Sequence, residues 1–173
     1  MKINKKKGIL FWITGLSGSG KTSIANKIKK DITKKYGPTI ILNGDDIRNI
    51  FNLKKFDIKH RLKLALSYSK LCKSISDQKI NIIFPTVSMF NKIRNYNRKN
   101  IKNYLEIYIK ANIKKIIRKN KKKIYYKSRI NIVGLDIKPE LPKKPDIIVL
   151  NNFDKNLNTI SKNLITKINL KLK

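Results

Sequence analysis

The chain has 173 residues and a formal net charge of +32, with 42 Lys and Arg residues against 10 Asp and Glu. No apolar run approaches the roughly 20 residues that span a bilayer, and the single cysteine, Cys72, excludes an internal disulfide. We therefore expect one domain over residues 1–173, without a targeting segment, located in the cytoplasm and with no membrane partner. The lysines are spread along the whole chain, which favours a solvated basic surface over a specific nucleic-acid site.

Strand-like and helix-like segments alternate along the chain, and their order predicts an α/β fold. Such alternation is typical of a mainly parallel sheet, here five-stranded, that is flanked by helices on both faces. The expected strands are residues 9–14, 39–43, 80–85, 104–109 and 146–150. The expected helices are residues 21–35, 46–52, 58–77, 91–103, 113–122 and 154–169.

A strand, a glycine-rich loop and a helix open the predicted sheet. The loop has the spacing G-x-x-x-x-G-K-[ST] of a phosphate-binding P-loop, Gly15-Leu16-Ser17-Gly18-Ser19-Gly20-Lys21-Thr22. The backbone N–H groups of such a loop surround phosphate oxygens, its lysine reaches the β- and γ-phosphates, and its hydroxyl binds Mg²⁺. We therefore expect Lys21 to be catalytic and Thr22 to be the magnesium ligand. The loop and the next residue, Ser23, are expected to bind ATP.

A second polar cluster, Asn43-Gly44-Asp45-Asp46-Ile47-Arg48, follows the strand predicted over residues 39–43. In an open α/β sheet, ligands bind beyond the carboxyl ends of the strands, so this cluster is expected near the P-loop. Asp45 suits a base for an incoming hydroxyl or a partner of Mg²⁺, and Arg48 suits a second phosphate. A turn followed by a helix N-cap is the structural alternative.

Residues 119–145 differ in composition from the rest of the chain. They are first basic and then contain Gly134, Pro139, Pro142 and Pro145. No apolar periodicity ties this segment to the core, so we expect a mobile lid and its return loop.

Together these motifs resemble the adenylylsulfate (APS) kinase family of P-loop kinases. That family has G-L-S-G-x-G-K-[ST] and D-G-D-N-x-R where this chain has residues 15–22 and 43–48. Its Phe and Arg five residues apart correspond to Phe56 and Arg61, and its I-S-P to Val87-Ser88-Met89. Its lid motifs correspond to residues 122–129 and 132–142, and the resemblance runs in register over residues 8–152.

The resemblance implies transfer of phosphate from MgATP to the ribose 3′-hydroxyl of a nucleotide acceptor. It implies that Asp45 is the acceptor-side base or orienter and that Phe56 stacks on the acceptor base. It further implies acceptor contacts from Arg48, Arg61 and Ser88, and from Lys127, Arg129 and Ile132 of the lid.

The acceptor half departs from the family pattern. Asn43 stands where the D-G-D-N motif has its first Asp, and Asp46 stands where the motif has its Asn. Met89 replaces the Pro of I-S-P. Leu64 stands where the family has an acceptor-contacting Asn, and Ile132 where a Phe closes over the adenine. A lost amide leaves a polar group of the same ligand unpaired, and Ile stacks less well than Phe.

Some relatives of APS kinase, found with capsule-modification genes, phosphorylate cytidine diphosphoramidate. Cytidine diphosphoramidate has a smaller base than APS, and this smaller base fits the altered acceptor residues. We therefore favour cytidine diphosphoramidate as the acceptor, with ordinary APS kinase activity as the alternative. Another small P-loop kinase, for nucleosides or gluconate, would leave residues 134–142 unexplained. A basic nucleic-acid-binding ATPase is the alternative of another class, and residues 114–127 would be its nearest basic, aromatic element. The sequence leaves open whether the chain forms a homodimer.

Overall fold

The computed structural model describes residues 3–55, 57–119 and 132–173. Within that part, one five-stranded sheet has the order β2-β3-β1-β4-β5, and all neighbouring strands are parallel. The α/β class with a parallel sheet is therefore confirmed. The strands are β1 (Leu10–Thr14), β2 (Thr39–Ile41), β3 (Asn81–Thr86), β4 (Tyr104–Lys110) and β5 (Ile147–Leu150).

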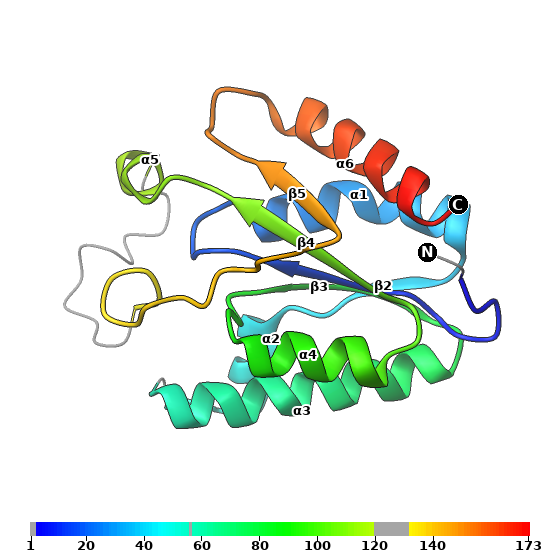
Figure 1. Cartoon of the computed structure of the whole chain (residues 1–173), viewed down its shortest axis with the longest axis horizontal. Coiled ribbons are helices and arrows are strands. Elements are labelled where there is room, and N and C mark those ends of the chain that lie inside the picture. Colours follow the sequence, from blue (N-terminus) through cyan, green and yellow to red (C-terminus); the bar gives the residue numbers. More distant parts are fainter. Residues whose placement is uncertain (1–2, 56, 120–131) are drawn as a thin grey trace.

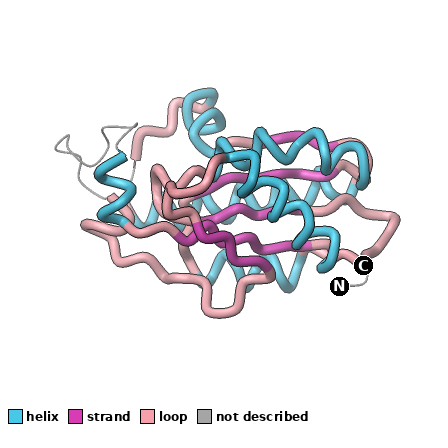
Figure 2. Tube along the Cα trace, turned by 90° about the horizontal axis from the view of Figure 1, so that it is seen from above, coloured by secondary structure: helices cyan, strands magenta, loops and turns pink. Residues whose placement is uncertain are grey.

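Helices lie on both faces of the sheet (Figures 1 and 2). One face is covered by α1 and α6, and the other by α3 and α4 (Figure 1). The two short helices α2 and α5 lie beyond the carboxyl ends of the strands. The helices are α1 (Lys21–Tyr36), α2 (Gly44–Ile50), α3 (Ile58–Asp77), α4 (Asn91–Asn100), α5 (Ile113–Lys119) and α6 (Leu157–Lys171).

The central strand β1 shows why the strand segments are apolar throughout. Successive side chains of a strand point to opposite faces. Phe11 and Ile13 belong to the core under α1 and α6, whereas Leu10 and Trp12 belong to the core under α3 and α4. All four side chains are fully buried. A strand that is buried on both faces needs a continuous apolar run.

Asparagine side chains set several helix boundaries that differ from the sequence prediction. α2 begins at Gly44 because Asn43 Oδ1 accepts the Asp45 N–H at 3.3 Å. α6 begins at Leu157 because Asn156 Oδ1 accepts the Thr159 N–H at 2.8 Å. Both side chains act as N-caps, so α2 does have the side-chain cap of the structural alternative, but the cap is Asn43 rather than an aspartate, and Asp45 and Asp46 lie in the first turn.

The return part of the expected lid packs more closely than the sequence predicts. Val133 and Ile137 are buried in a small cluster with Met89. Arg94 Nη2 donates to the Glu140 carbonyl at 2.6 Å, and the Glu140 N–H donates to the Met89 carbonyl at 3.1 Å. The expectation that nothing ties this segment to the core is therefore wrong for residues 132–145. Two isolated apolar residues produce no periodic signal.

The remaining sequence-level expectations concern Cys72 and the membrane. Cys72 is buried in the core under α3, and burial raises the pKa of its thiol. Among the helices of residues 3–55, 57–119 and 132–173, none combines the length and apolar character that crossing a bilayer requires.

Candidate active site

The loop between β1 and α1 has a backbone that depends on glycine. Gly18 and Gly20 have φ values of 74° and 91°, which L side chains rarely adopt. A Cβ at Gly18 would lie 2.9 Å from an Ile116 side-chain carbon, and a Cβ at Gly20 would lie 2.7 Å from Asn151 Nδ2. Conformation and space therefore both require glycine here, as expected of a P-loop.

Lys21 is the first residue of α1, as the sequence predicts. Its side chain is only 7% exposed, and its Nζ donates to the Leu16 carbonyl at 2.7 Å. The N-terminus of α1 adds its partial positive charge at the same place. Ser19 Oγ is buried and lacks a hydrogen-bond partner within the part of the chain that the structure describes. The loop thus gathers donors that suit a phosphate chain.

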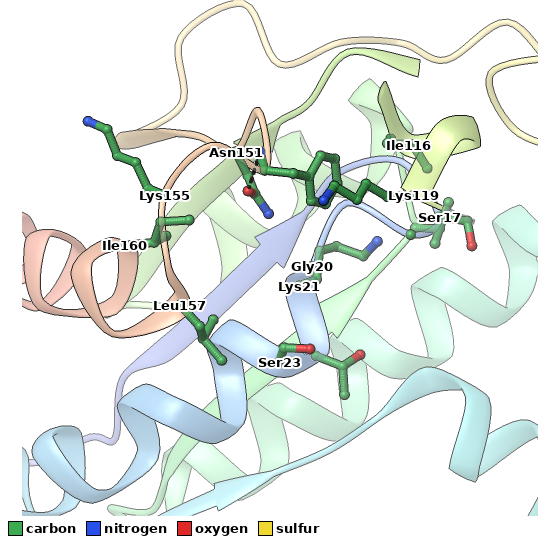
Figure 3. A pocket seen from close by; sticks show the side chains of 14 residues that line it. Ser17, Gly20, Lys21, Ser23, Ile116, Lys119, Asn151, Lys155, Leu157 and Ile160 are labelled. Atoms are coloured by element: carbon green, nitrogen blue, oxygen red, sulfur yellow. Dashed lines mark hydrogen bonds between the residues drawn. The ribbon is translucent and has the colours of Figure 1, made fainter. Parts of the chain in front are cut away.

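A cavity of about 440 Å³ opens beside this loop (Figure 3). The P-loop wall includes Lys21 and Thr22. Further lining comes from α5 and from the loop after β5, and includes Ile116 and Asn151, which contact the P-loop, and Phe153. Apolar and aromatic groups beside phosphate donors are typical of a nucleotide site. Sequence reasoning missed this lining because its residues belong to no motif; their only signal is their position after β4 and β5.

A second, smaller cavity of about 100 Å³ lies beside α2 and α3. It brings together four residues that the sequence predicted for the acceptor, Asp45, Arg48, Arg61 and Ser88. Lys21 and Val87 line both cavities. The P-loop lysine therefore lies where the two cavities meet.

Two guanidinium groups dominate the electrostatics of the smaller cavity. Burial lowers the pKa of Arg61 from its usual value, and the positive charge of Arg48 lowers it further. The negative charge of Asp45 acts in the opposite direction. Arg48 Nη1 also donates to the Lys55 carbonyl at 3.3 Å. Two positive charges close together favour binding of an anionic group between them.

Tyr68, which sequence reasoning missed, lines the smaller cavity from α3. It is 5% exposed, and its hydroxyl donates to the carbonyl of Gly44 at 3.0 Å. Its ring lies 5.2 Å from that of Phe84, at a tilt of 47°. Burial raises the pKa of the Tyr68 hydroxyl. Tyr68 thus holds the start of α2, which carries Asp45 and Arg48.

Ser88 occupies a fixed position at the carboxyl end of β3. Its N–H donates to Thr86 Oγ1 at 3.1 Å, and its carbonyl accepts from Thr14 Oγ1 at 3.3 Å. Its own Oγ is buried and lacks a partner among the described residues. An unpaired buried hydroxyl is costly, so Ser88 suits a polar contact with a ligand.

Some predicted acceptor residues are placed differently. Val133, rather than Ile132, is the residue of the return segment that lines the smaller cavity, and Val133 is also part of the buried cluster with Met89. Leu64 packs against the core under α3 instead of lining the cavity. The other predicted acceptor residues, Phe56, Lys127 and Arg129, lie outside the described residues.

Residues 7–150 match the family model of adenylylsulphate kinase. The chain belongs to this family. Cytidine diphosphoramidate kinase of Campylobacter jejuni is 36% identical over 170 residues, which cover 96% of this chain and 99% of that protein. Adenylyl-sulfate kinase of Clostridium kluyveri is 31% identical over 159 residues, which cover 88% of this chain and 80% of that protein.

The fold is shared with a solved member of the family. The Mycobacterium tuberculosis APS kinase in complex with AMPPNP and APS has a TM-score of 0.85, with 23% identity, and covers 94% of this chain and 98% of that one. The predicted resemblance and the P-loop kinase fold are therefore both confirmed. The family makes this chain a kinase that binds ATP and acts on a nucleotide.

Proposed function

We propose that this kinase transfers the γ-phosphate of MgATP to the ribose 3′-hydroxyl of cytidine diphosphoramidate, a step in capsule biosynthesis. The observation that carries the proposal is that the two cavities meet at Lys21 and Val87. A phosphate chain on the P-loop and a hydroxyl in the smaller cavity would then approach each other at Lys21. The 36% identity to the Campylobacter jejuni kinase, over nearly the whole of both chains, supports the acceptor.

Thr22 would hold Mg²⁺ beside the phosphates. Within residues 3–55, 57–119 and 132–173 there is no group of three or more His, Cys, Asp or Glu side chains that could hold a metal. The Thr22 hydroxyl lines the ATP-side cavity and is an oxygen ligand of the kind that Mg²⁺ takes together with waters and phosphate oxygens. The ion would neutralise phosphate charge when bound. Lys21 would leave the Leu16 carbonyl and stabilise the charge that develops during transfer.

Asp45 would handle the proton of the acceptor. It is exposed, lines the smaller cavity and lies in the first turn of α2. As the acceptor oxygen bonds to the γ-phosphorus, the bond to the β-phosphate oxygen breaks and ADP leaves with that electron pair. The hydroxyl proton passes to Asp45 and then to water. Arg48 and Arg61 would hold the bridging phosphates, and Ser88 Oγ would contact the acceptor.

The lining of the smaller cavity bears on the choice of acceptor. Tyr68 and Val133 are among its lining residues. Leu64, packed against the core, offers no amide to an adenine. Ordinary APS kinase activity is the second candidate, because the matching family model is that of adenylylsulphate kinase.

The test is a direct comparison of the two acceptors with MgATP. We expect kcat/KM for cytidine diphosphoramidate to exceed that for APS at least ten-fold, since each unpaired polar group costs about 1–3 kcal/mol. NMR of the product should place the new phosphate on the 3′-oxygen. A higher kcat/KM for APS would contradict the acceptor and leave the ordinary APS kinase. Turnover of neither, with ATP hydrolysis that DNA stimulates, would favour the nucleic-acid-binding ATPase.

A further inference from the structure

Asn151 connects two parts of the ATP-side cavity that are far apart in sequence. It follows β5 directly, is 6% exposed, and its N–H donates to the Lys110 carbonyl at 2.9 Å. Its Nδ2 donates to the Ser19 carbonyl of the P-loop at 2.9 Å. Its Oδ1 accepts the N–H of Phe153 at 3.2 Å. One buried amide thus joins the phosphate-binding loop to the loop after β5.

The bond to Ser19 fixes the direction of a P-loop N–H group. The described chain contains no cis peptide bond, and in a trans peptide the C=O and the following N–H point in opposite directions. Because Asn151 holds the Ser19 carbonyl, the N–H of Gly20 is turned away from Asn151. Such N–H groups are what a P-loop offers to phosphate. The absence of a side chain at Gly20 makes room for Asn151 Nδ2, which a Cβ would approach to 2.7 Å.

The bond to Phe153 stabilises an uncommon backbone conformation. Phe153 has a φ of 62°, in the left-handed region that bulky residues rarely adopt. Phe153 and Lys155 line the cavity from the loop after β5. Figure 3 shows Asn151 beside the P-loop, with Lys155, Leu157 and Ile160 on the far wall. The same side chain therefore positions both the phosphate cradle and the loop after β5.

We propose that Asn151 is a positioning residue that couples the P-loop to the loop after β5, so that nucleotide affinity depends on its amide. Its role is to hold protein backbone rather than to take part in phosphoryl transfer. The acceptor cavity lies on the other side of Lys21 and does not include Asn151. Loss of the amide should therefore weaken ATP binding and leave acceptor binding unchanged.

The experiment compares Asn151→Ala and Asn151→Asp with the wild-type chain. Calorimetry would measure the Kd for AMPPNP, and steady-state kinetics would measure KM for ATP and for the acceptor. Each hydrogen bond contributes about 1 kcal/mol, so we expect the Kd of Asn151→Ala to rise about ten-fold or more. The Kd for AMPPNP should rise further in Asn151→Asp than in Asn151→Ala, because the new carboxylate faces the Ser19 carbonyl. We expect KM for the acceptor to stay within about two-fold of wild type.

The Asp variant also gives a rescue experiment. Asp has nearly the volume of Asn, so this variant changes the charge and the donor of residue 151 rather than the packing around it, and a thermal melt of each variant shows whether it is folded. A protonated carboxyl can donate to the Ser19 carbonyl, whereas a carboxylate cannot. The gap between the Asn151→Asp and wild-type Kd should therefore narrow as the pH falls toward the pKa of the new carboxyl. A gap that stays constant with pH would contradict the assigned bond.

Asn156→Ala is the matched control. Asn156 lies in the same loop, but its Oδ1 caps α6 through the Thr159 N–H. Its loss should lower Tm, because a lost cap costs about 1 kcal/mol, without changing the Kd for AMPPNP. An equal rise in the Kd for AMPPNP in Asn151→Ala and Asn156→Ala would mean that nucleotide affinity merely follows the stability of the fold. That result would contradict the proposal. The proposal would fall equally if Asn151→Ala bound AMPPNP like wild type.

Discussion

The ATP side and the acceptor side of this kinase are constructed differently. On the ATP side, backbone conformation forms the site: Gly18 and Gly20 are left-handed, and the loop is held by a hydrogen bond from Asn151. On the acceptor side, side chains from α2, α3 and the end of β3 converge on a smaller cavity. Ligand contacts made by backbone groups are kept when most side chains are exchanged, whereas a substitution in a cavity lined by side chains alters the ligand contacts directly. One family can therefore keep ATP and vary the acceptor.

The largest effect should come from the residue that the two sides share. Lys21→Ala should reduce kcat roughly 10³-fold or more, because it removes a charge that acts on the transferring phosphate. Lys27→Ala, an exposed lysine of the same helix, should be close to wild type in the same phosphoryl-transfer assay. Substantial turnover by Lys21→Ala would remove the basis for placing the reaction where the cavities meet.

A smaller loss is expected on the acceptor side alone. Asp45→Asn should reduce kcat about 10²-fold or more if Asp45 takes the acceptor proton, with KM for ATP unchanged. The neighbouring Asp46→Asn is the control, since Asp46 is exposed and does not line the smaller cavity. Wild-type turnover in Asp45→Asn together with loss in Asp46→Asn would transfer the role of base to Asp46.

The smallest expected effect tests whether the acceptor side depends on Tyr68. Tyr68→Phe removes only the hydroxyl that donates to Gly44. A net loss of about 1 kcal/mol should raise KM for the acceptor about five-fold and leave KM for ATP unchanged. Tyr36→Phe is the control, because the Tyr36 hydroxyl donates to Asn169 Oδ1 at 2.8 Å and lines neither cavity. A rise in both KM values for Tyr68→Phe would mean that the two sides are not separate.

The sequence predicts the ATP side, which depends on backbone conformation, better than the acceptor side, which depends on converging side chains. The glycine spacing of residues 15–22 and the apolar strand segments indicate the P-loop and the sheet, because local patterns determine both. Motif resemblance predicts Arg48, Arg61 and Ser88 as acceptor residues; the structure brings them into one cavity, and their role stays a prediction.

Residues whose role depends on tertiary contacts were not predictable in the same way. Tyr68 lies among the apolar residues of α3 and looks like a core residue until its hydroxyl is seen to reach Gly44. Asn151 looks like an ordinary loop residue because its partner, Ser19, is far away in sequence. The sequence predicts Ile132 or a neighbour for the acceptor wall, and the neighbour Val133 lines the smaller cavity; neither lies in a periodic element that would fix which side chain points inward.

The strand order has a consequence for synthesis of the chain. β1 leads the sheet in sequence, yet its two neighbours are β3 and β4. An emerging chain therefore exposes the apolar run Leu10–Thr14 until Asn81–Thr86 and then Tyr104–Lys110 have left the ribosome. Such long-range pairing folds slowly and exposes chains to aggregation. The lysines behind the net charge of +32 are spread along the chain, so partly made molecules also carry positive charge, which would keep them apart during that interval.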